Sequence, residues 1–542
     1  MRAWLRNDLE GGWLDFSRGS VLVAHSLGEV MPLLEQVEVH VAEGGFAAGF
    51  LSYEAAPAFD KSLVARRGTG PLAWFVLVTE PTRFVPPILA STPLDLAATW
   101  SSSEYEARYQ AVQNHLAHGD CYQINLTFSL TGQGDGRGFW PSCRDARFGA
   151  WLEDGDWRIL SASPECFLEW REDVIWSEPM KGTRPAGSPD SLADSEKDRA
   201  ENLMIVDMIR NDLGRIARRG SVRVPELFRV EDHPTVRQMT SRVVAETDAP
   251  LSERLASLFP CASITGAPKV KATEIIANLE TTPRGVYTGA IGWVGPGVGQ
   301  FSVAIRTLVQ RGDQITYGIG SGVVSDSTAE AEYAECRLKA EILRRNVPYP
   351  GKLLETMRLA DGLIPRLDAH LARLAASHFA LFGQELSTEE LRQELEQQTG
   401  SGRLRLTLAP GEEPQLELST LPTNRGEIKL QRASHPIYSE DLAVQHKTTN
   451  RAVYEQFERG DADDVLLYNE RGEVTETTIY NVAAFLDGKW WTPPLASGLL
   501  PGTMRAELAY PERVILMREL TSSTPLRVFN SLRREHPARL LD

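Results

Sequence analysis

The segment Arg344–Lys352 (RRNVPYPGK) constrains the folding of this chain more than any other feature. Its two prolines and one glycine follow a stretch of strong helical character, Ala329–Arg345, and neither residue type continues a helix. At 542 residues the chain is also too long for one ordinary hydrophobic core. We therefore expect two folding units, residues 1–346 and 353–542, joined by a linker over residues 347–352.

The charge balance and the cysteines exclude several classes of protein. The formal net charge is −16, and no block of like charges forms a basic patch for nucleic acid or an anionic membrane. No run approaches the roughly 18 apolar residues that a membrane helix needs, and MRAWLRNDLEGGW at the amino terminus contains no apolar signal segment. The five cysteines are widely spaced and odd in number, which argues against disulfides or zinc. We expect a soluble, cytoplasmic protein that binds neither nucleic acid nor membrane.

The first predicted unit mixes two kinds of hydrophobic pattern. Phe46–Tyr53 and Phe301–Val309 are rich in strand-forming residues, whereas Tyr105–His118 has the spacing of an amphipathic helix. The mixture is typical of an α+β fold that buries large sheets.

The second predicted unit begins with a turn. Leu353–Leu359 and Ile364–Leu367 bracket an Ala-Asp-Gly sequence and are expected to pair as a β-hairpin. His370–Phe382 follows with leucines or alanines at helical spacing, and Gly383 is expected to end that helix. No repeat relates the two units, so we expect two different folds in tandem.

Two predicted helices, Ser195–Arg210 and Ala329–Arg345, carry paired carboxylates. Residues three apart share a helix face, which applies to Asp198 with Glu201 and to Glu332 with Glu335. Magnesium prefers oxygen ligands and is usually held by one or two protein carboxylates. Spacing alone leaves a second interpretation open, in which both faces are solvated and paired with nearby lysines and arginines.

A series of motifs in the first predicted unit resembles the chorismate-utilising enzymes. The motifs occur in the order of that superfamily, which implies the layered α/β-sandwich of anthranilate synthase component I. They are SASPECF (161–167), PMKGTRP (179–185), KDRAENLMIVDMIRNDLGRI (197–216), GSVRVPELF (220–228), SITGAPKVKATEII (263–276), IRT (305–307) and GIGSGVVSDSTAEAEYAECRLKA (318–340).

Three positions distinguish the reactions within that superfamily. Anthranilate synthases usually have alanine at the position of Lys181 and histidine at that of Gln238. Isochorismate and salicylate synthases have a water-activating lysine at the position of Gln123. The chain is therefore most similar to component I of the aminodeoxychorismate synthases, which replace the ring hydroxyl of chorismate by an amino group.

The resemblance implies a role for each matching residue. Lys181 would attack the chorismate ring as a neutral amine and form a covalent adduct, while Glu165 would protonate the leaving hydroxyl. Glu201 and Glu335 would bind magnesium directly, and Asp198 and Glu332 would do so through water.

The same resemblance implies a binding pocket for the carboxylates of chorismate. Arg306 would bind one of them through its planar guanidinium. The rest of the expected pocket consists of Gly320, Ser321, Gly322, Thr265 and Tyr287. For Tyr287 the interpretation as an ordinary core aromatic stays equally open.

The second predicted unit resembles the fold-type IV pyridoxal-phosphate enzymes, a further α+β fold. The matching motifs are LLETMR…DG…LDAHLARLAASH (353–378), HKTTNR (446–451), VTETTIYNV (474–482) and LLPGTMR (499–505). Within this family the KxxNR form of residues 447–451 is closest to the 4-amino-4-deoxychorismate lyases. The resemblance implies that Lys447 binds the cofactor covalently and that Glu476 keeps its pyridine nitrogen protonated. Arg373 and Thr503 would hold its phosphate.

Two features depart from the fold-type IV pattern. These enzymes usually open with an acidic, glycine-rich segment ahead of ETMR, and here the hairpin follows the linker directly. That segment is either dispensable in a fused chain or replaced by contacts from the first half. Pro511–Asp542 matches no part of the pattern.

Together the two resemblances imply a bifunctional enzyme that makes 4-aminobenzoate from chorismate and ammonia. Magnesium and pyridoxal 5'-phosphate are the implied cofactors. No segment resembles a glutaminase, so we expect use of free ammonia or a separate glutamine amidotransferase subunit. A homodimer through the pyridoxal-phosphate unit is a further expectation.

Two other interpretations stay open at this point. One combines an anthranilate synthase-like first half with a branched-chain or D-amino-acid aminotransferase-like second half. The other is a catalytically inactive binding or scaffolding protein.

Overall fold

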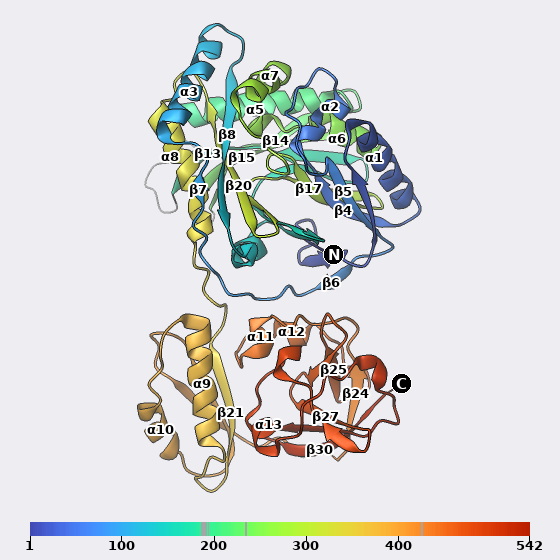
Figure 1. Ribbon diagram of the computed structural model, residues 1–542, viewed down its shortest axis with the longest axis vertical. Coiled ribbons are helices and arrows are strands. Elements are labelled where there is room, and N and C mark those ends of the chain that lie inside the picture. The colour runs from blue at the N-terminus through green and yellow to red at the C-terminus, as the bar shows by residue number, and fades with distance from the viewer. Residues whose placement is uncertain (186–191, 193–194, 233–235, 424–425, 542) are drawn as a thin grey trace. The chain divides into compact units, whose positions relative to one another are not determined.

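The computed structural model describes residues 1–185, 192, 195–232, 236–423 and 426–541 (Figure 1). In it the chain divides into two compact units. The first contains Met1–Phe84 and Ser91–Asn346, and the second contains Val85–Ala90 and Val347–Asp542. The predicted boundaries, by contrast, place Val85–Ala90 in the first unit.

The first unit contains two large antiparallel sheets. In the order of their hydrogen-bonded neighbours, the strands of the first sheet are β16 (Gly266–Ala267), β8 (Gln123–Gln133), β20 (Gln314–Val323), β19 (Thr307–Arg311), β10 (Trp157–Ser163), β9 (Phe148–Asp154), β1 (Arg2–Arg6), β2 (Trp13–Asp15) and β6 (Thr82–Phe84), with β7 (Ala97–Ala98) also on β8. Those of the second are β13 (Met180–Pro185), β15 (Val236–Glu246), β12 (Val174–Glu178), β11 (Cys166–Arg171), β18 (Val298–Val303), β17 (Ala290–Gly295), β4 (Phe46–Leu51), β5 (Ala73–Val78) and β3 (Ser20–Ala24), with β14 (Arg223–Asp232) also on β15.

Strand β4 shows why the two sheets pack face to face. Side chains alternate between the faces of a strand, and in FAAGFL both faces are apolar. Ala48 and Phe50 join a buried cluster that also contains Leu5 and Leu152 of the first sheet. The opposite face of β4 belongs to a different cluster, so this strand is buried on both sides.

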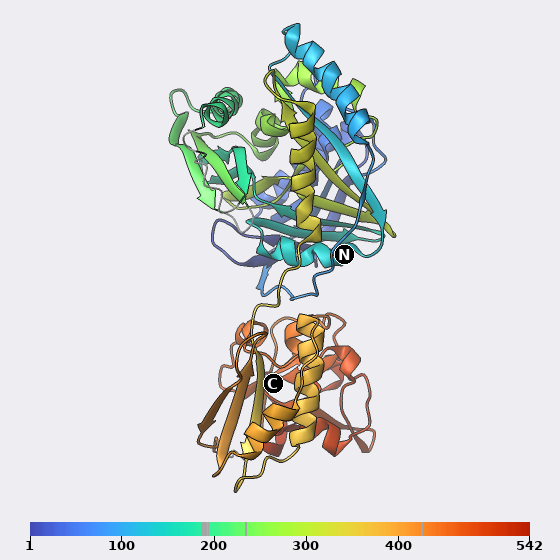
Figure 2. The same ribbon diagram turned by 90° about the vertical axis from the view of Figure 1, so that its left-hand side faces the viewer.

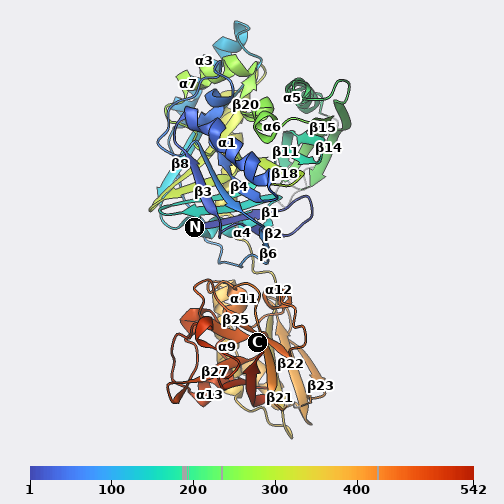
Figure 3. The ribbon, with the colours of Figure 1, turned by 90° about the vertical axis from the view of Figure 1, so that its right-hand side faces the viewer.

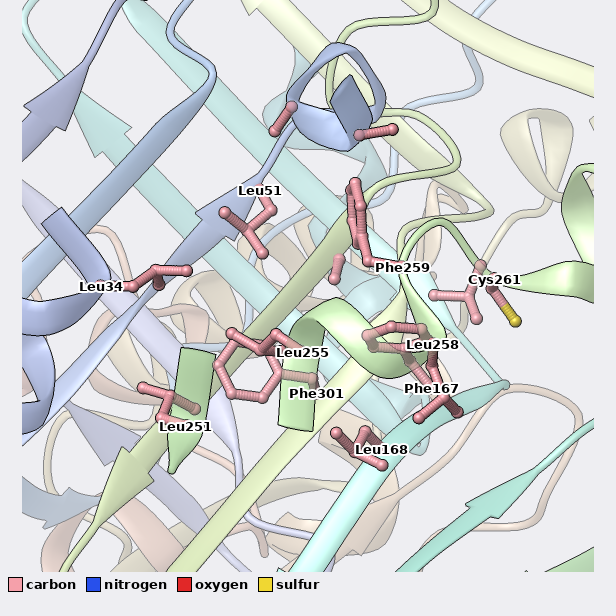
Figure 4. Packing of buried hydrophobic residues seen from close by; sticks show 14 of the residues in the cluster. Leu34, Leu51, Phe167, Leu168, Leu251, Leu255, Leu258, Phe259, Cys261 and Phe301 are labelled. Carbon is pink, nitrogen blue, oxygen red and sulfur yellow. The ribbon is translucent and has the colours of Figure 1, made fainter. Parts of the chain in front are cut away.

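Helices cover the other face of the second sheet (Figure 4). Leu51 and Phe301 of this sheet pack there with Leu34 and Leu255 from two helices. The helices of the first unit are α1 (Leu27–Ala42), α2 (Ala56–Phe59), α3 (Ser102–Ala117), α4 (Trp140–Asp145), α5 (Glu196–Gly214), α6 (Leu251–Leu258), α7 (Lys269–Leu279) and α8 (Ala329–Ala340).

Two of these helices position carboxylates. Helix α8 packs on β20 and beside α3 (Figure 2), and α5 packs on β15 (Figure 3). The layers of sheets and helices confirm the α+β sandwich that the sequence predicts. The predicted helix Ala329–Arg345 is wrong at its end, because α8 stops at Ala340 and a 3-10 turn, Glu341–Arg344, follows.

The second unit also contains two sheets. The smaller consists of β21 (Leu353–Leu359), β22 (Gly402–Leu408) and β23 (Gln415–Ser419), and the larger has the order β26 (Val474–Thr477), β25 (Asp464–Tyr468), β24 (Ile428–Arg432), β30 (Arg534–Leu540), β29 (Leu526–Asn530), β27 (Asn481–Leu486) and β28 (Lys489–Trp491). The helices are α9 (Leu367–Phe382), α10 (Glu389–Glu396), α11 (Leu442–Gln445), α12 (Ala452–Glu455) and α13 (Thr503–Leu508). The residues after Pro511, which the sequence left unassigned, form β29 and β30.

The predicted hairpin at the start of the second unit is wrong. Asp361 and Gly362 have the left-handed backbone of a tight turn, at φ 53° and 80°, but only the bridge between Ala360 and Leu363 forms. Pro365 has no N–H to continue a ladder, and α9 begins at Leu367. Strand β21 pairs with β22 instead. Gly383, at φ 69°, ends α9 as predicted.

Val85–Ala90 contributes to the core of the second unit. Ile88 is buried in a cluster with Val444 and Tyr454. Its N–H donates to Asp441 Oδ1 at 3.2 Å, and its carbonyl accepts from the Leu442 N–H at 2.9 Å. A segment from within the first half of the sequence is therefore part of this unit.

Candidate functional site

The first unit contains a cavity of about 690 Å³ that is lined by many of the residues singled out from the sequence. Its volume lies within the range of ordinary small-molecule sites, roughly 300–1,000 Å³. The expected residues on its wall are Glu165, Lys181, Asp198, Glu201, Tyr287, Arg306, Gly320, Gly322, Glu332 and Glu335.

Lys181 reaches the cavity from an irregular strand. It lies in β13, whose pairing with β15 shifts between Met180 and Thr183, and Gly182 there has a φ of 82°. Such a bulge redirects a side chain. The Lys181 side chain is 14% exposed, and its Nζ lies 3.4 Å from Glu201 Oε2. In this structure the amine therefore has a carboxylate partner on α5.

Glu165 lies between β10 and β11 and is buried, with 3% exposure. The Ser263 hydroxyl donates to its Oε1 at 2.6 Å. Burial raises the pKa of Glu165 to about 7, although Ser263 and Lys181 act in the opposite direction. A carboxyl group with this pKa holds a proton near neutral pH and is able to donate it.

The four acidic residues of α5 and α8 come together on the wall of one cavity. Glu335 forms an ion pair with Lys339 at 2.8 Å, and Glu332 Oε1 accepts from the Ser327 hydroxyl at 2.7 Å. Burial raises the pKa of Glu332. Among the described residues, no group of three or more His, Cys, Asp or Glu is arranged to hold a metal ion. The carboxylate donors suit magnesium. In this structure Lys181 and Lys339 form ion pairs with two of them, Glu201 and Glu335.

The expected carboxylate pocket is only partly on the cavity wall. Arg306, Tyr287, Gly320 and Gly322 line the cavity as the structure describes it, and Thr265 and Ser321 do not. The Thr265 hydroxyl donates to Cys261 O at 2.8 Å, and the Ser321 hydroxyl lies 2.9 Å from Tyr105 Oη. Their side chains thus support the wall from behind.

Arg306 has an unusual backbone. Its φ of 49° is left-handed, which is strained for a residue other than glycine. The strand sequence breaks here, since β18 ends at Val303 and β19 begins at Thr307. The break turns the guanidinium onto the cavity wall.

Two glutamines lie beside Lys181 with unused hydrogen-bonding groups. Gln123 is fully buried, and among the described residues neither its amide nitrogen nor its oxygen has a partner. A Cβ at Gly322 would lie 2.7 Å from both Gln123 Nε2 and Lys181 Nζ, which places these two groups close together. Gln238 lines the cavity, and its Oε1 is likewise without a partner in the described part of the chain. Buried polar groups of this kind indicate a ligand.

Sequence reasoning missed Lys339 and Ser263. Lys339 lines the cavity and donates to Gly320 O at 2.8 Å. Its position four residues after Glu335 is typical of a solvated helix pair, so spacing gave no reason to place it in a site. Ser263 lies within the SITGAPK motif, but only the fold shows that its hydroxyl reaches Glu165.

The second unit places Lys447 in a strongly charged environment. Desolvation, followed by the charge of Arg373, lowers the pKa of the Lys447 amine to about 8, and Glu476 also acts on it. Glu476 is 4% exposed, and burial raises its pKa to about 7. Its carboxylate accepts from Tyr454 Oη at 2.8 Å and from Asn481 Nδ2 at 3.2 Å.

Arg373 and Thr503 lie around a buried acid that the sequence did not single out. Arg373 Nε and Nη2 donate to the two oxygens of Glu355 at 2.8 and 2.7 Å. His370 Nδ1 lies 2.7 Å from Glu355 Oε2, and its Nε2 lies 3.4 Å from Thr503 Oγ1. Arg373 Nη1 donates to Pro501 O, two residues before Thr503.

These residues fit pyridoxal phosphate by their donor chemistry. A lysine with a lowered pKa is an amine that is neutral in part at neutral pH. A buried carboxylate held by two donors suits a protonated ring nitrogen, and an arginine with a nearby threonine hydroxyl suits a phosphate. Electrostatic contact between Lys447, Arg373 and Glu476 shows that the fold brings three of the four expected residues together.

None of the helices in the described part of the chain is both long and apolar enough to span a membrane.

Two family matches meet near the boundary between the two units. Residues 81–345 match the family model of the chorismate binding enzymes, and residues 352–540 match that of class IV amino-transferases. Membership of the class IV family implies pyridoxal phosphate as the cofactor of the second unit.

The first unit has curated relatives and a structural neighbour. Aminodeoxychorismate synthase component 1 of Klebsiella aerogenes is 41% identical over 285 residues, which cover 49% of this chain and 61% of the relative. The same component of Escherichia coli K12 is 43% identical over 264 residues, covering 44% and 57%. The chain thus spans about three fifths of the length of these relatives.

The structural neighbour is anthranilate synthase component I from Streptococcus pneumoniae TIGR4, with a TM-score of 0.52 and 24% identity over 58% of this chain and 85% of the neighbour. This likeness shows the fold, and it confirms the anthranilate synthase component I-like sandwich. The chain combines a chorismate binding enzyme domain over residues 81–345 with a class IV amino-transferase domain over residues 352–540.

Proposed function

We propose that this chain is a bifunctional enzyme of 4-aminobenzoate synthesis. The unit within residues 1–346 aminates chorismate to 4-amino-4-deoxychorismate. The unit within residues 353–542, joined to it by residues 347–352, eliminates pyruvate from that product to give 4-aminobenzoate. The observation that carries the first half of the proposal is the shared cavity of Lys181, Glu165 and the acidic residues of α5 and α8.

In the first step Lys181 Nζ attacks the chorismate ring. A carbon–nitrogen bond forms on the side of the ring away from the hydroxyl, both conjugated ring double bonds shift by one position, and the bond to the ring hydroxyl breaks. Glu165 donates a proton so that the oxygen leaves as water, and its pKa of about 7 provides that proton at neutral pH. Ammonia then adds at the carbon that lost the hydroxyl, and the bond to Lys181 breaks.

Glu201 has two roles that exclude each other. It pairs with Lys181 in this structure, and it is also a proposed magnesium ligand together with Glu335, while Asp198 and Glu332 act through water. Magnesium, when bound, neutralises carboxylate charge on the substrate. A Glu201 that binds metal releases the Lys181 amine from this ion pair, so that the amine can approach the substrate.

Arg306 and the backbone of Gly320 and Gly322 are proposed to bind the substrate carboxylates. The guanidinium supplies a planar pair of donors. Thr265 and Ser321 support this wall, and Tyr287 forms part of it.

In the second unit Lys447 is proposed to bind pyridoxal phosphate and to move the proton. The cofactor supplies an electron sink for the elimination. Glu476 keeps the ring nitrogen protonated, Arg373 and Thr503 hold the phosphate, and Lys447 takes a ring proton from the substrate and returns one as pyruvate leaves. The lowered pKa of Lys447 supports this exchange at neutral pH.

Ammonia is proposed to come from solution or from a separate glutamine amidotransferase. The relatives in Klebsiella aerogenes and Escherichia coli are named component 1 of their synthases. We further propose a cytoplasmic enzyme that forms a homodimer through its second unit.

A product assay on the full chain tests the proposal. Wild type, supplied with chorismate, ammonium, magnesium and pyridoxal phosphate, should yield 4-aminobenzoate. Lys447→Ala should stop at 4-amino-4-deoxychorismate, and Lys181→Ala should consume no chorismate in this reaction. Anthranilate as the main product of the wild type would overturn the proposal.

A further inference from the structure

The side chain of the proposed general acid Glu165 is held by two groups, the backbone of Met180 and the hydroxyl of Ser263. The Ser263 hydroxyl donates to Glu165 Oε1 at 2.6 Å, and both residues are buried, with 3% and 7% exposure. A hydroxyl that donates to a buried carboxyl helps to fix which way the carboxyl oxygens point. The orientation of Glu165 toward the cavity therefore depends on the position of Ser263 as well as on that of Met180.

Ser263 lies on a 3-10 turn, Ala262–Ile264, which the fold holds from behind. Arg284 Nη1 donates to Ile264 O at 2.9 Å, one residue after Ser263. Arg284 Nη2 donates to Asn125 O at 2.7 Å on β8. One guanidinium thus ties the turn to the strand that forms the cavity wall.

Arg284 is itself fixed by a buried ion pair. Its Nε and Nη2 donate to the two oxygens of Glu280 at 2.9 and 2.7 Å, and both side chains are at most 5% exposed. Glu280 Oε1 also accepts from the N–H and hydroxyl of Thr127 on β8. Since the planar Arg284 guanidinium donates hydrogen bonds from all three of its nitrogens, it cannot shift without breaking several of them.

The turn is also bonded directly to β8. Asn125 Nδ2 donates to Ile264 O at 3.0 Å, and the Asn125 N–H donates to Thr265 O at 2.9 Å. These bonds and that of Arg284 Nη1 converge on Ile264, the last residue of the turn, and on Thr265, which follows it. Among the described side chains of this turn, that of Ser263 is the one that bonds to an expected catalytic residue, Glu165.

We infer that Ser263 is the positioning residue of Glu165, and that the buried Arg284–Glu280 pair acts on catalysis by holding the turn that carries Ser263. This inference rests on the proposed function, because it assigns Glu165 a proton to donate. In this role Ser263 acts through Glu165, to which its hydroxyl donates.

Several charged and titratable groups besides Ser263 face Glu165. Lys181 and Lys339 act on it from β13 and α8, Arg306 from the break before β19, and the Cys261 thiol from the start of the turn. The Ser263 substitution keeps all four groups, and besides the bond to Glu165 it removes the contact between the hydroxyl and the Cys261 thiol at 3.3 Å. A change in the titration of Glu165 in that variant therefore reports the hydroxyl.

The first experiment compares Ser263→Ala with wild type in chorismate amination. We expect kcat to fall about 10-fold with KM within about twofold, since a charge-assisted hydrogen bond is lost beside an unchanged pocket. The fall in rate at high pH should move to higher pH. The Ser263 hydroxyl stabilises the ionised carboxylate of Glu165, so its loss raises the pKa of that group. Ser263→Thr keeps the hydroxyl and should restore both. Ser257→Ala removes a buried serine hydroxyl on α6 that bonds to Arg254 O, and it should leave both unchanged.

The second experiment places Arg284 in the same chain of contacts. Arg284→Lys keeps the charge and loses the fork, so kcat should fall by a similar factor. In the double variant Ser263→Ala/Arg284→Lys the two losses should not multiply, since both act through one contact. Multiplying losses would overturn the role of Arg284. A Ser263→Ala enzyme with unchanged kcat, or with a lower kcat and an unshifted pH profile, would overturn the role of Ser263.

A third measurement separates this inference from the proposed function. The ionisation of Glu165 is followed by infrared difference spectroscopy against Glu165→Gln, which needs no turnover. If the wild type fails to aminate chorismate, the proposed function fails, and a raised midpoint in Ser263→Ala still supports the contact. An unchanged midpoint would overturn the contact whatever the activity.

Discussion

The two candidate sites each combine a lysine with a buried glutamate, but they surround the lysine with opposite charges. Lys181 faces the carboxylate of Glu201 at 3.4 Å, whereas Lys447 lies near the cation of Arg373. The first arrangement gives the amine a carboxylate partner, whereas burial and then the charge of Arg373 lower the pKa of the Lys447 amine to about 8. A lysine that attacks only when substrate and metal are present suits the first pattern, and one that holds a cofactor throughout suits the second.

The two glutamates differ in their neighbours rather than in their pKa. Burial raises the pKa of both Glu165 and Glu476 to about 7. Glu165 accepts from the Ser263 hydroxyl and lies on the wall of the cavity that Lys181 also lines, while Glu476 accepts from both Tyr454 and Asn481. A place on the cavity wall suits Glu165 to giving a proton to a bound substrate, and a carboxyl held by two side-chain donors suits Glu476 to pairing with a ring nitrogen.

The largest effects are expected from replacing each lysine in turn, because each substitution should abolish the function of one site and spare the other. Lys181→Ala should lower the rate of chorismate amination by at least about 10³-fold, because a nucleophile is lost. It should leave the visible absorbance of bound pyridoxal phosphate unchanged. Lys447→Ala should do the reverse, with full amination and no such absorbance. Stopped assays of both products, with spectra of the same samples, check this, and a variant that loses both signals would contradict two independent sites.

The next largest effect is expected from Glu165→Gln. An amide cannot supply the proton for the leaving hydroxyl, so kcat should fall about 10²–10³-fold. In the wild type the rate should fall as pH rises through about 7, where Glu165 loses its proton, and this limb should be absent from the variant. Rates of amination between pH 5.5 and 9 test this. Glu476→Gln is the matched control and should leave that profile intact while it weakens the binding of pyridoxal phosphate.

Stability should also respond in opposite directions in the two units. Despite burial, Arg373 and His370 lower the pKa of Glu355 from 4.5 to about 2, so its contribution is full above pH 4.5 and lost as pH falls toward 2. Glu355→Gln should therefore destabilise the second unit by ~3 kcal/mol at pH 7. Urea unfolding monitored by cofactor absorbance, or thermal unfolding measured by calorimetry, gives this loss of stability. The difference from wild type should shrink in acid.

Glu169→Gln in the first unit is the contrasting variant. Burial raises the pKa of Glu169 to about 7, and its Oε1 has no partner among the described residues. An acid whose pKa is raised in the fold loses stabilisation as pH rises from 4.5 to 7. The substitution should therefore leave the first unit as stable as wild type or more stable above pH 7. A loss there as large as that of Glu355→Gln would refute the contrast.

The sequence predicted the two folds and ten of the residues on the cavity wall, because each depends on local pattern or on motifs. Gly383 ends its helix for a reason visible in the chain alone, and Asp198 shares a helix face with Glu201. The contacts that could not be predicted are long-range. Ser263 reaches Glu165 across 98 residues, and Ile88 joins a core more than 350 residues away, at Val444. No periodicity or spacing encodes such contacts, since they exist only after the sheets have formed.

The smallest expected effect concerns the wall beside Lys181. A methyl group at position 322 would lie 2.7 Å from both Lys181 Nζ and Gln123 Nε2, so Gly322→Ala must displace the ends of two side chains. These ends are flexible, so the fold should tolerate the change while the amine loses its position. We expect KM for chorismate to rise about 10-fold, with folding stability within ~1 kcal/mol of wild type.

Gly214→Ala, on the last turn of α5, is the matched control for that variant. A Cβ there would meet nothing within 4 Å, and alanine favours the helix over glycine by up to ~1 kcal/mol. It should raise stability slightly and leave KM unchanged, although it lies on the helix that carries Glu201. Steady-state kinetics and urea unfolding of both variants check the pair. If Gly322→Ala also left KM unchanged, chorismate would bind away from the Lys181 amine, and the difference between the two lysines would no longer concern nucleophilic attack.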